Sequence, residues 1–176
     1  MGVLLTTFLV TVLVDLTAAI ELGAVLSAFL FMKRMANVTS VKLLAKEIEE
    51  DENVVELPTN KFIVPTGVEV YEIDGPLFFG AASQFDEADR AIGERPKVRI
   101  LRFRDVPIID STGMRALKNF YHRCRSHHIK FIVTGIHVQP LNEMIKSKLY
   151  DLIGEENVFS NVKDALNRAE ALVREK

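Results

Sequence analysis

The chain has 176 residues, of which 48% are hydrophobic, and its 22 basic and 24 acidic side chains give a net charge of −2. This balance gives no basis for nucleic-acid binding, which requires a basic surface. The single cysteine, Cys124, excludes an intramolecular disulfide and suits a reducing compartment.

The first 32 residues are almost entirely apolar and carry only two charges, Asp15 and Glu21. Lys33 and Arg34 then end the segment, and a chain of ordinary soluble composition follows. This pattern predicts a membrane segment joined to a water-soluble domain. The basic pair predicts that this domain is cytoplasmic, because basic residues favour the cytoplasmic side of membrane segments.

Two arrangements of this segment are open. A bilayer core requires roughly 20 apolar residues of helix, and each apolar run beside the charges is only about half as long. In one arrangement a single helix spans residues 3–32 and turns its carboxylates toward protein or water. In the other, two short helices meet near Asp15 and Thr17, either of which can cap the second helix. A turn at that depth needs surrounding protein, so the second arrangement implies a larger membrane body.

Two other interpretations of the N-terminus have less support. A secretory signal would have basic residues before its apolar core and a cleavage site after it, and neither is present. Gly2 fits only a loose myristoylation pattern, and an acyl chain beside so apolar a segment would add little.

Residues 33–60 hold four bases and six acids and end near Pro58, which predicts a solvated helix followed by a charged linker over 36–60. The roughly 115 residues that remain, 61–176, are enough for one compact domain.

Within this domain, strand-like and helix-like segments alternate. Runs of branched and aromatic residues predict strands at 68–73, 98–103 and 129–134, with shorter strands at 62–64 and 157–159. Helical spacing and capping residues predict helices over 83–92, from 110 to 124, after Pro140, and after a cap at Ser160 or Asn161. Alternation of this kind predicts an α/β fold with a largely parallel sheet flanked by helices.

Several chemically active residues in this domain have simple structural explanations. Arg99, Arg102 and Arg104 lie on one predicted strand, and we expect them at its solvated ends and faces. Cys124 follows Leu117 and Tyr121 at helical spacing, so we expect it to be buried. The four histidines form no metal spacing, and no phosphate loop or nucleophile motif is present. We therefore expect no metal, no cofactor and no enzymatic activity.

The segment Asp110-Ser111-Thr112-Gly113 is the best candidate site in the domain. Its hydroxyls precede a predicted helix, where free backbone N–H groups and the helix dipole favour negative charge. A phosphate on Ser111 or Thr112 would be stabilised there and could switch a docking surface. The simpler alternative is that these residues only cap the helix, which is their commonest role.

Two separated segments resemble one family. The apolar segment, including Asp15, Thr17 and Glu21, resembles the last membrane segments of the SulP family of anion permeases. The soluble part resembles the STAS domain that follows those segments, through residues 73–81 (Ile-Asp-Gly-Pro-Leu-Phe-Phe-Gly-Ala) and 108–117 (Ile-Ile-Asp-Ser-Thr-Gly-Met-Arg-Ala-Leu). The resemblance favours the two-helix arrangement and gives the domains as 1–35, membrane segments; 36–60, linker; and 61–176, STAS domain.

The resemblance implies secondary active transport of sulfate or another small anion, such as bicarbonate or a dicarboxylate, with a cytoplasmic regulatory STAS domain. A complete permease carries about a dozen further membrane segments that hold its anion site, so we expect a fragment that does not transport alone. Its expected partners are the lipid bilayer of the inner or plasma membrane, the remaining permease helices, and a STAS-binding protein or a second copy.

In related anti-sigma-factor antagonists the hydroxyl just before the motif glycine is phosphorylated, which corresponds to Thr112. The alternative function is therefore a membrane-tethered STAS binding module switched by phosphorylation. A soluble signalling antagonist is least favoured, because 30 exposed apolar residues would far exceed the apolar patch of a soluble monomer, on the order of a few hundred Å².

Overall fold

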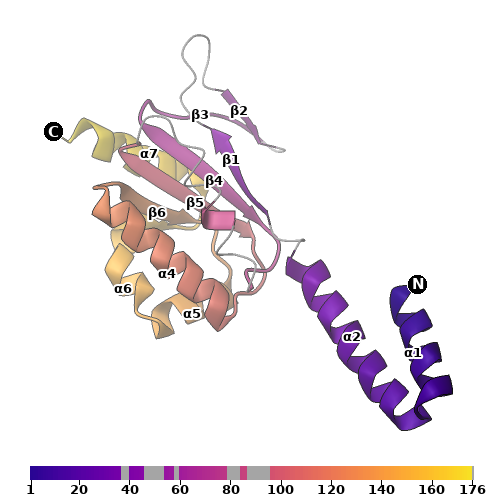
Figure 1. Cartoon of the computed structure of the whole chain (residues 1–176). Coiled ribbons are helices and arrows are strands. Elements are labelled where there is room, and N and C mark those ends of the chain that lie inside the picture. Colours follow the sequence, from indigo (N-terminus) through magenta and orange to yellow (C-terminus); the bar gives the residue numbers. More distant parts are fainter. Residues whose placement is uncertain (37–39, 46–53, 58–59, 79–83, 87–95, 176) are drawn as a thin grey trace. The chain divides into compact units, whose positions relative to one another are not determined.

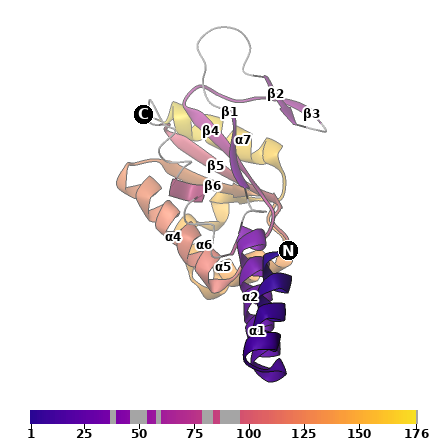
Figure 2. The ribbon, with the colours of Figure 1, turned by 45° about the vertical axis from the view of Figure 1, so that its right-hand side comes forward.

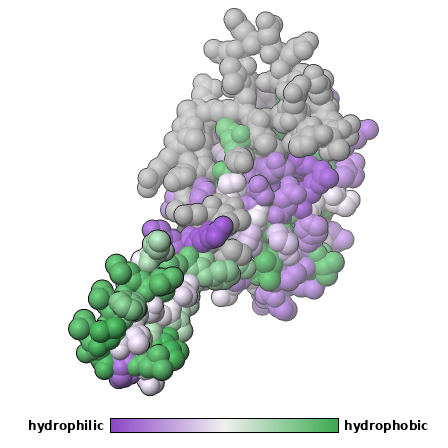
Figure 3. Space-filling model, turned by 90° about the vertical axis from the view of Figure 1, so that its right-hand side faces the viewer, coloured by the Kyte–Doolittle hydropathy of each residue, from purple (hydrophilic) through white to green (hydrophobic). Residues whose placement is uncertain are grey.

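The computed structural model describes residues 1–36, 40–45, 54–57, 60–78, 84–86 and 96–175. The chain divides into two compact units, Met1–Val38 and Thr39–Lys176. The surfaces of the two units differ. In Figure 3 the first unit is largely hydrophobic, and the second is mainly hydrophilic with separate hydrophobic patches.

The first unit is a pair of helices, α1 (Gly2–Leu13) and α2 (Leu16–Ala36), which lie side by side in Figures 1 and 2. The predicted break is confirmed, and Asp15 caps α2 by accepting a hydrogen bond of 2.8 Å from the backbone N–H of Ala18. The helices approach closely at Gly23, where a Cβ atom would lie 2.7 Å from Cγ2 of Thr7. Small residues permit such close packing in membranes.

The second helix is longer than the apolar run from which it was predicted. It contains 21 residues, and its segment Leu16–Arg34 is long and apolar enough to cross a membrane. Helix α1 is a shorter apolar helix of 12 residues. Only α2 is therefore long enough to cross a bilayer core, which requires roughly 20 residues of helix.

The second unit is built on a five-stranded sheet with the order β1-β4-β5-β6-β7. Its strands are β1 (Ser40–Ala45), β4 (Val68–Asp74), β5 (Val98–Asp105), β6 (Lys130–Thr134) and β7 (Val158–Phe159). The last four are parallel, and β1 pairs antiparallel with β4. The predicted α/β class and parallel pairing are confirmed.

Strand β1 corrects one prediction. We expected a solvated helix and then a linker over 33–60, but Ser40 to Ala45 form an edge strand of the main sheet. Val41 and Leu43 alternate along it and pack against the core, which outweighs the charged composition of the surrounding segment. The short strand predicted at 62–64 is present as β3 (Asn60–Ile63), which pairs with β2 (Val54–Leu57) in a separate hairpin.

Helices cover both faces of the sheet (Figures 1 and 2). One face packs against α4 (Ser111–Ser126), α5 (Val138–Lys146) and α6 (Leu149–Ile153), and the other against α7 (Val162–Arg174). A short 3₁₀ helix, η1 (Glu155–Asn157), precedes β7. The cap of α7 is Asn161, whose side chain accepts a 3.0 Å hydrogen bond from the N–H of Asp164.

Two helices differ from their predictions. Helix α5 begins at Val138, before Pro140, because proline is tolerated in the first turn of a helix, where its missing N–H has no partner to lose. Helix α6 was not predicted, because five residues are too few to show a clear period. The helix predicted over 83–92 lies mostly outside the described residues, which include only the turn 84–86; its Phe85 is buried as expected.

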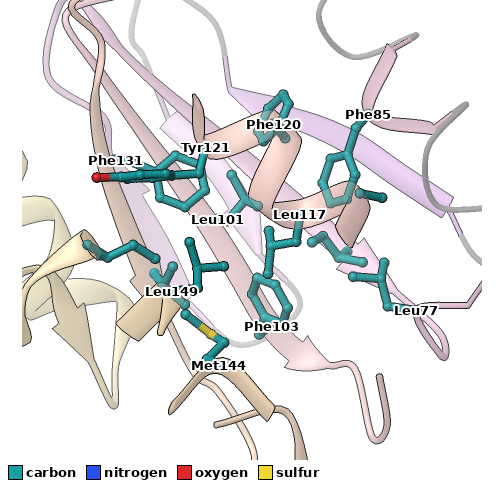
Figure 4. Packing of buried hydrophobic residues seen from close by; sticks show 14 of the residues in the cluster. Leu77, Phe85, Leu101, Phe103, Leu117, Phe120, Tyr121, Phe131, Met144 and Leu149 are labelled. Atoms are coloured by element: carbon teal, nitrogen blue, oxygen red, sulfur yellow. The ribbon is translucent and has the colours of Figure 1, made fainter. Parts of the chain in front are cut away.

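The larger core lies between the sheet and α4, α5 and α6 (Figure 4). Phe103, Phe120 and Leu117 are fully buried there, and Phe85 stacks on Phe120 with ring centroids 4.8 Å apart. Helix α4 is thereby fixed against the sheet. Its first turn lies at the end of the sheet where the parallel strands terminate.

Candidate functional site

The candidate site is the turn Asp110-Ser111-Thr112-Gly113, which connects β5 to α4. Asp110 is the cap of α4, and its Oδ1 accepts a hydrogen bond of 2.6 Å from the N–H of Gly113. The side chain of Asp110 therefore accepts a hydrogen bond from one of the backbone N–H groups that have no partner within the helix.

Gly113 is buried against the chain that follows β4. A Cβ atom at this position would lie 2.0 Å from the carbonyl oxygen of Leu77. That oxygen also accepts a hydrogen bond of 3.2 Å from the N–H of Asp110, and Leu77 forms a parallel bridge with Ile109. The turn requires glycine here because main-chain atoms fill the space of a side chain.

Helix α5 holds the turn from the other side. The side chain of Gln139 accepts a 2.9 Å hydrogen bond from the N–H of Ile109 and donates one of 3.0 Å to its carbonyl oxygen. Nearby, Nε2 of His137 donates to the carbonyl oxygen of Arg104 at 2.6 Å. The residue just before the turn is thus fixed by two bonds to one side chain.

Ser111 and Thr112 are both exposed, and neither hydroxyl makes a hydrogen bond within the described residues. Asp110 is the residue that caps the helix, so the capping explanation applies to Asp110 and leaves both hydroxyls accessible. Arg115, also exposed, follows Thr112 by three residues on the same helix, a spacing that places side chains on one face. Together with the helix dipole it would attract a negative group.

The membrane-segment residues are not part of this turn. Asp15 caps α2, and Thr17 and Glu21 lie in the first turns of that helix. They belong to the first unit, and the turn belongs to the second. In the described part of the chain, no three His, Cys, Asp or Glu side chains come together as metal ligands.

Two ion pairs, one buried and one partly buried, were not predicted. We expected Arg99 and Arg102 at solvated positions, and this was wrong, since they are 0% and 6% exposed. Arg99 bonds Oε2 of Glu69 at 3.2 Å, and Arg102 bonds Oε1 of Glu72 at 2.7 Å. The remaining arginine of that strand, Arg104, is exposed as expected.

The sequence contains a signal for these pairs. Two glutamates three residues apart on one strand match two arginines three residues apart on the next, and the register places each glutamate opposite its arginine. Charges directly opposite on neighbouring strands attract. Successive side chains of a strand alternate between the two faces of the sheet, so a separation of three residues puts the two pairs on opposite faces.

The pair of Glu69 and Arg99 lies on the sheet face that packs against α4, where both apolar and polar groups surround it. The guanidinium of Arg99 is 5.0 Å from the ring centroid of Phe120 and donates to Sγ of Cys124 at 3.3 Å. The hydroxyl of Tyr71 donates to the same Oε2 of Glu69 at 3.2 Å. Cys124 is buried as predicted, and it contacts a charged group as well as apolar side chains.

Comparisons with known proteins agree with this architecture. The model of the STAS domain matches residues 61–165. A putative sulfate transporter, YvdB, from Bacillus subtilis is 28% identical over 90% of this chain and 28% of its own length. This chain thus spans less than a third of that relative.

Two solved structures are also similar to this chain. A sulfate transporter family protein from Wolinella succinogenes is 41% identical, with a TM-score of 0.62, and the match covers 65% of this chain and 94% of that one. The STAS domain of a SulP transporter from Vibrio cholerae is 30% identical, with a TM-score of 0.58 and coverage of 64% and 88%.

Proposed function

Because this chain belongs to the STAS-domain family, we propose that it is the C-terminal membrane and cytoplasmic STAS part of a secondary active transporter of sulfate or another inorganic anion. The observation that carries the proposal is the order of its parts. A helix long enough to cross a bilayer precedes the STAS domain, and the similarity to a sulfate transporter covers 90% of the chain and so extends into that helix.

The surface of the first unit supports a membrane location. Most of its large apolar side chains are exposed, Phe8, Leu13 and Phe29 among them. Exposed apolar surface on this scale is unfavourable in water and favourable in lipid. Lys33 and Arg34 occupy the last turn of α2, which supports a cytoplasmic location for the second unit beside the inner or plasma membrane.

We further propose that this chain alone does not transport. It spans 28% of the length of the sulfate transporter that it resembles, and we expect the anion site in other membrane helices. Those helices and the bilayer would be the partners of the first unit. A STAS-binding protein or a second copy would be the partner of the second.

Reconstitution tests this proposal directly. The chain would be inserted into lipid vesicles, and uptake of radiolabelled sulfate and bicarbonate would be measured against empty vesicles under a pH or sodium gradient. We expect uptake equal to the leak of empty vesicles. Saturable uptake above that leak would overturn the fragment proposal. The DNA ahead of the codon for Met1 gives a second test, since an in-frame coding region for further apolar helices supports the proposal.

The exposed hydroxyls support a second candidate function, a membrane-tethered binding module switched by phosphorylation at Thr112. A phosphate carries a charge of about −1.5 to −2 at neutral pH. At Thr112 it would lie at the start of α4 with Arg115 one turn away. The same environment is available to Ser111, so the two hydroxyls must be distinguished by experiment.

Phosphosite mapping after incubation with cell lysate and ATP would make this distinction. The second candidate predicts phosphate on Thr112 and a changed set of bound proteins for Thr112→Glu, with Thr112→Val as the uncharged control. Ser111→Glu places the same charge one residue away and serves as the matched control. Absence of phosphate at both positions, together with unchanged binding by Thr112→Glu, would exclude the switch.

A further inference from the structure

Three exposed apolar side chains lie at the end of the second unit that carries the candidate site. Ile108 is 42% exposed, Val138 77% and Ile145 49%. Val138 and Ile145 are two turns apart on the same side of α5. Ile108 belongs to the same end of the unit as the start of α5, because the next residue, Ile109, forms two hydrogen bonds with Gln139, the residue after Val138. We call these three residues the α5 patch.

The α5 patch is unusual for this unit. Among the described residues of the second unit, only one other large apolar side chain is exposed, Leu152 at 38%, and it lies on the adjoining helix α6. Most of the remaining large apolar side chains whose burial is described enter one of the two cores or are partly buried against them, and Leu141 of α5 is half-buried outside both. Nothing in the fold requires valine at the first, solvent-facing position of α5, so the patch is not explained by folding alone.

Covalent connections place the α5 patch at a particular end of the sheet. The chain enters the second unit at Ser40, which pairs with Asp74 at the end of β4. The next residue, Gly75, donates to the carbonyl oxygen of Asp105, and Leu77 donates to that of Ile108. The patch is therefore at the end of the sheet where β1 begins.

The same end is tied to the membrane helix by a very short segment. Helix α2 ends at Ala36 and β1 begins at Ser40. Four peptide units extend at most about 14 Å. If α2 crosses a bilayer, the sheet end that carries Ser40 stays within reach of the lipid headgroups, whatever the orientation of the unit.

We propose that the α5 patch rests on the lipid headgroups of the membrane that α2 crosses, with Val138 and its two neighbours entering the interface. Apolar side chains gain free energy when they leave water for the boundary between headgroups and acyl chains. Lys146, beside the patch at the end of α5, is exposed and pairs with Glu143 at 2.7 Å, so the proposed contact depends on the apolar side chains and not on charge. The proposal rests on the proposed membrane location of α2.

Fluorescence quenching in the full chain tests this contact. Val138→Cys would be labelled with a small environment-sensitive thiol reagent, and the chain reconstituted in vesicles of phosphatidylcholine and phosphatidylglycerol with a lipid spin-labelled near its headgroup. Ser126→Cys is the matched control, because Ser126 is exposed at the other end of α4. Cys124 is buried, and the labelled parent chain measures its background. A probe in α2, at Val25→Cys, reports whether that helix lies in lipid.

We expect several-fold stronger lipid quenching at Val138 than at Ser126. Quenching at Val25 with equal, weak quenching at Val138 and Ser126 would overturn the contact and leave the membrane location intact. Absence of lipid quenching at Val25 would overturn both. Protection of Val138 from both lipid and aqueous quenchers would show a protein partner instead and would also overturn the proposal.

A second substitution makes the test specific to the patch. Ile145→Asn, in the Val138→Cys background, removes one apolar member of the surface without affecting the core, because Ile145 is exposed. We expect it to weaken the quenching at Val138. Leu152→Asn is the matched control, since Leu152 is an exposed leucine outside the patch. Equal effects of the two substitutions would contradict the assignment of the patch.

Discussion

Gly113, in the first turn of α4, lies directly against the main-chain carbonyl of Leu77, so that a Cβ atom at Gly113 would be 2.0 Å from the oxygen. The same oxygen accepts a hydrogen bond from the N–H of Asp110, which starts the turn. One carbonyl group therefore determines both where the turn begins and which residue can occupy its end.

This contact predicts that Gly113→Ala destabilises the second unit. Alanine usually stabilises a helix by about 1 kcal/mol relative to glycine. Here the steric conflict is with main chain that cannot move aside cheaply, and overpacking of this kind costs about 1–3 kcal/mol. We expect a net loss in the free energy of unfolding, measured by urea denaturation of residues 39–176. Ser111→Ala, in the same turn but exposed, should change it by less than about 0.5 kcal/mol. A stabilised Gly113→Ala variant would contradict the contact.

The amide of Gln139 predicts a graded effect on the same turn. Gln139→Ala removes both hydrogen bonds to Ile109, with an expected cost of about 1–3 kcal/mol in stability. Gln139→Glu keeps an acceptor for the N–H of Ile109 and loses only the donor. Hydrogen exchange of the Ile109 amide should therefore accelerate strongly in Gln139→Ala and weakly in Gln139→Glu. Equal exchange in the two variants would show that the side chain does not hold the turn.

The buried pair of Glu69 and Arg99 predicts strong non-additivity. Glu69→Ala leaves the guanidinium without its carboxylate in the core, which should cost about 3–5 kcal/mol in the free energy of unfolding. Replacing both residues with apolar ones, Glu69→Leu with Arg99→Met, removes the uncompensated charge and should recover much of this loss. Urea denaturation of Glu69→Leu, Arg99→Met and the double variant measures the coupling. Additive losses would mean that the pair contributes no interaction.

The dipole of α4 predicts an effect of charge sign at Thr112. Thr112→Asp should stabilise the second unit by about 0.3–1 kcal/mol at low salt, and Thr112→Lys should destabilise it by a similar amount. The same two substitutions at Asn119, an exposed position in the middle of α4, provide the control, because the dipole effect falls off within the first turn. Thermal unfolding at low and high salt measures both series. Equal effects of Asp and Lys at Thr112 would contradict a favourable environment for phosphate.

Much of the second unit follows from local patterns. The strands β4, β5 and β6 were predicted within two residues, because their branched and aromatic runs are flanked by turn residues. The cap of α7 was predicted as one of two residues, and Asn161 fills it. These features depend on neighbours in the sequence, and so the sequence contains the information needed to predict them.

The missed features depend on residues far apart in the chain. Strand β1 was taken for part of a linker because its charged surroundings suggested solvent, whereas pairing with β4 decides its conformation. Arg99 was expected at a solvated position, yet it lies opposite Glu69, which is 30 positions earlier in the chain. Gln139 gave no signal at all, because its role exists only where α5 meets Ile109.

The sequence by itself left open whether the apolar segment breaks at Asp15, but it determined the two-part organisation, the α/β class and the position of the Asp110–Gly113 turn. These follow from hydropathy, periodicity and capping, which act over a few residues. Only the tertiary structure decided that Asp110 provides the cap while Ser111 and Thr112 stay exposed, and that the carbonyl of Leu77 and the amide of Gln139 hold the turn. Those contacts join three separate segments, and packing brings them together only when the whole sheet has formed.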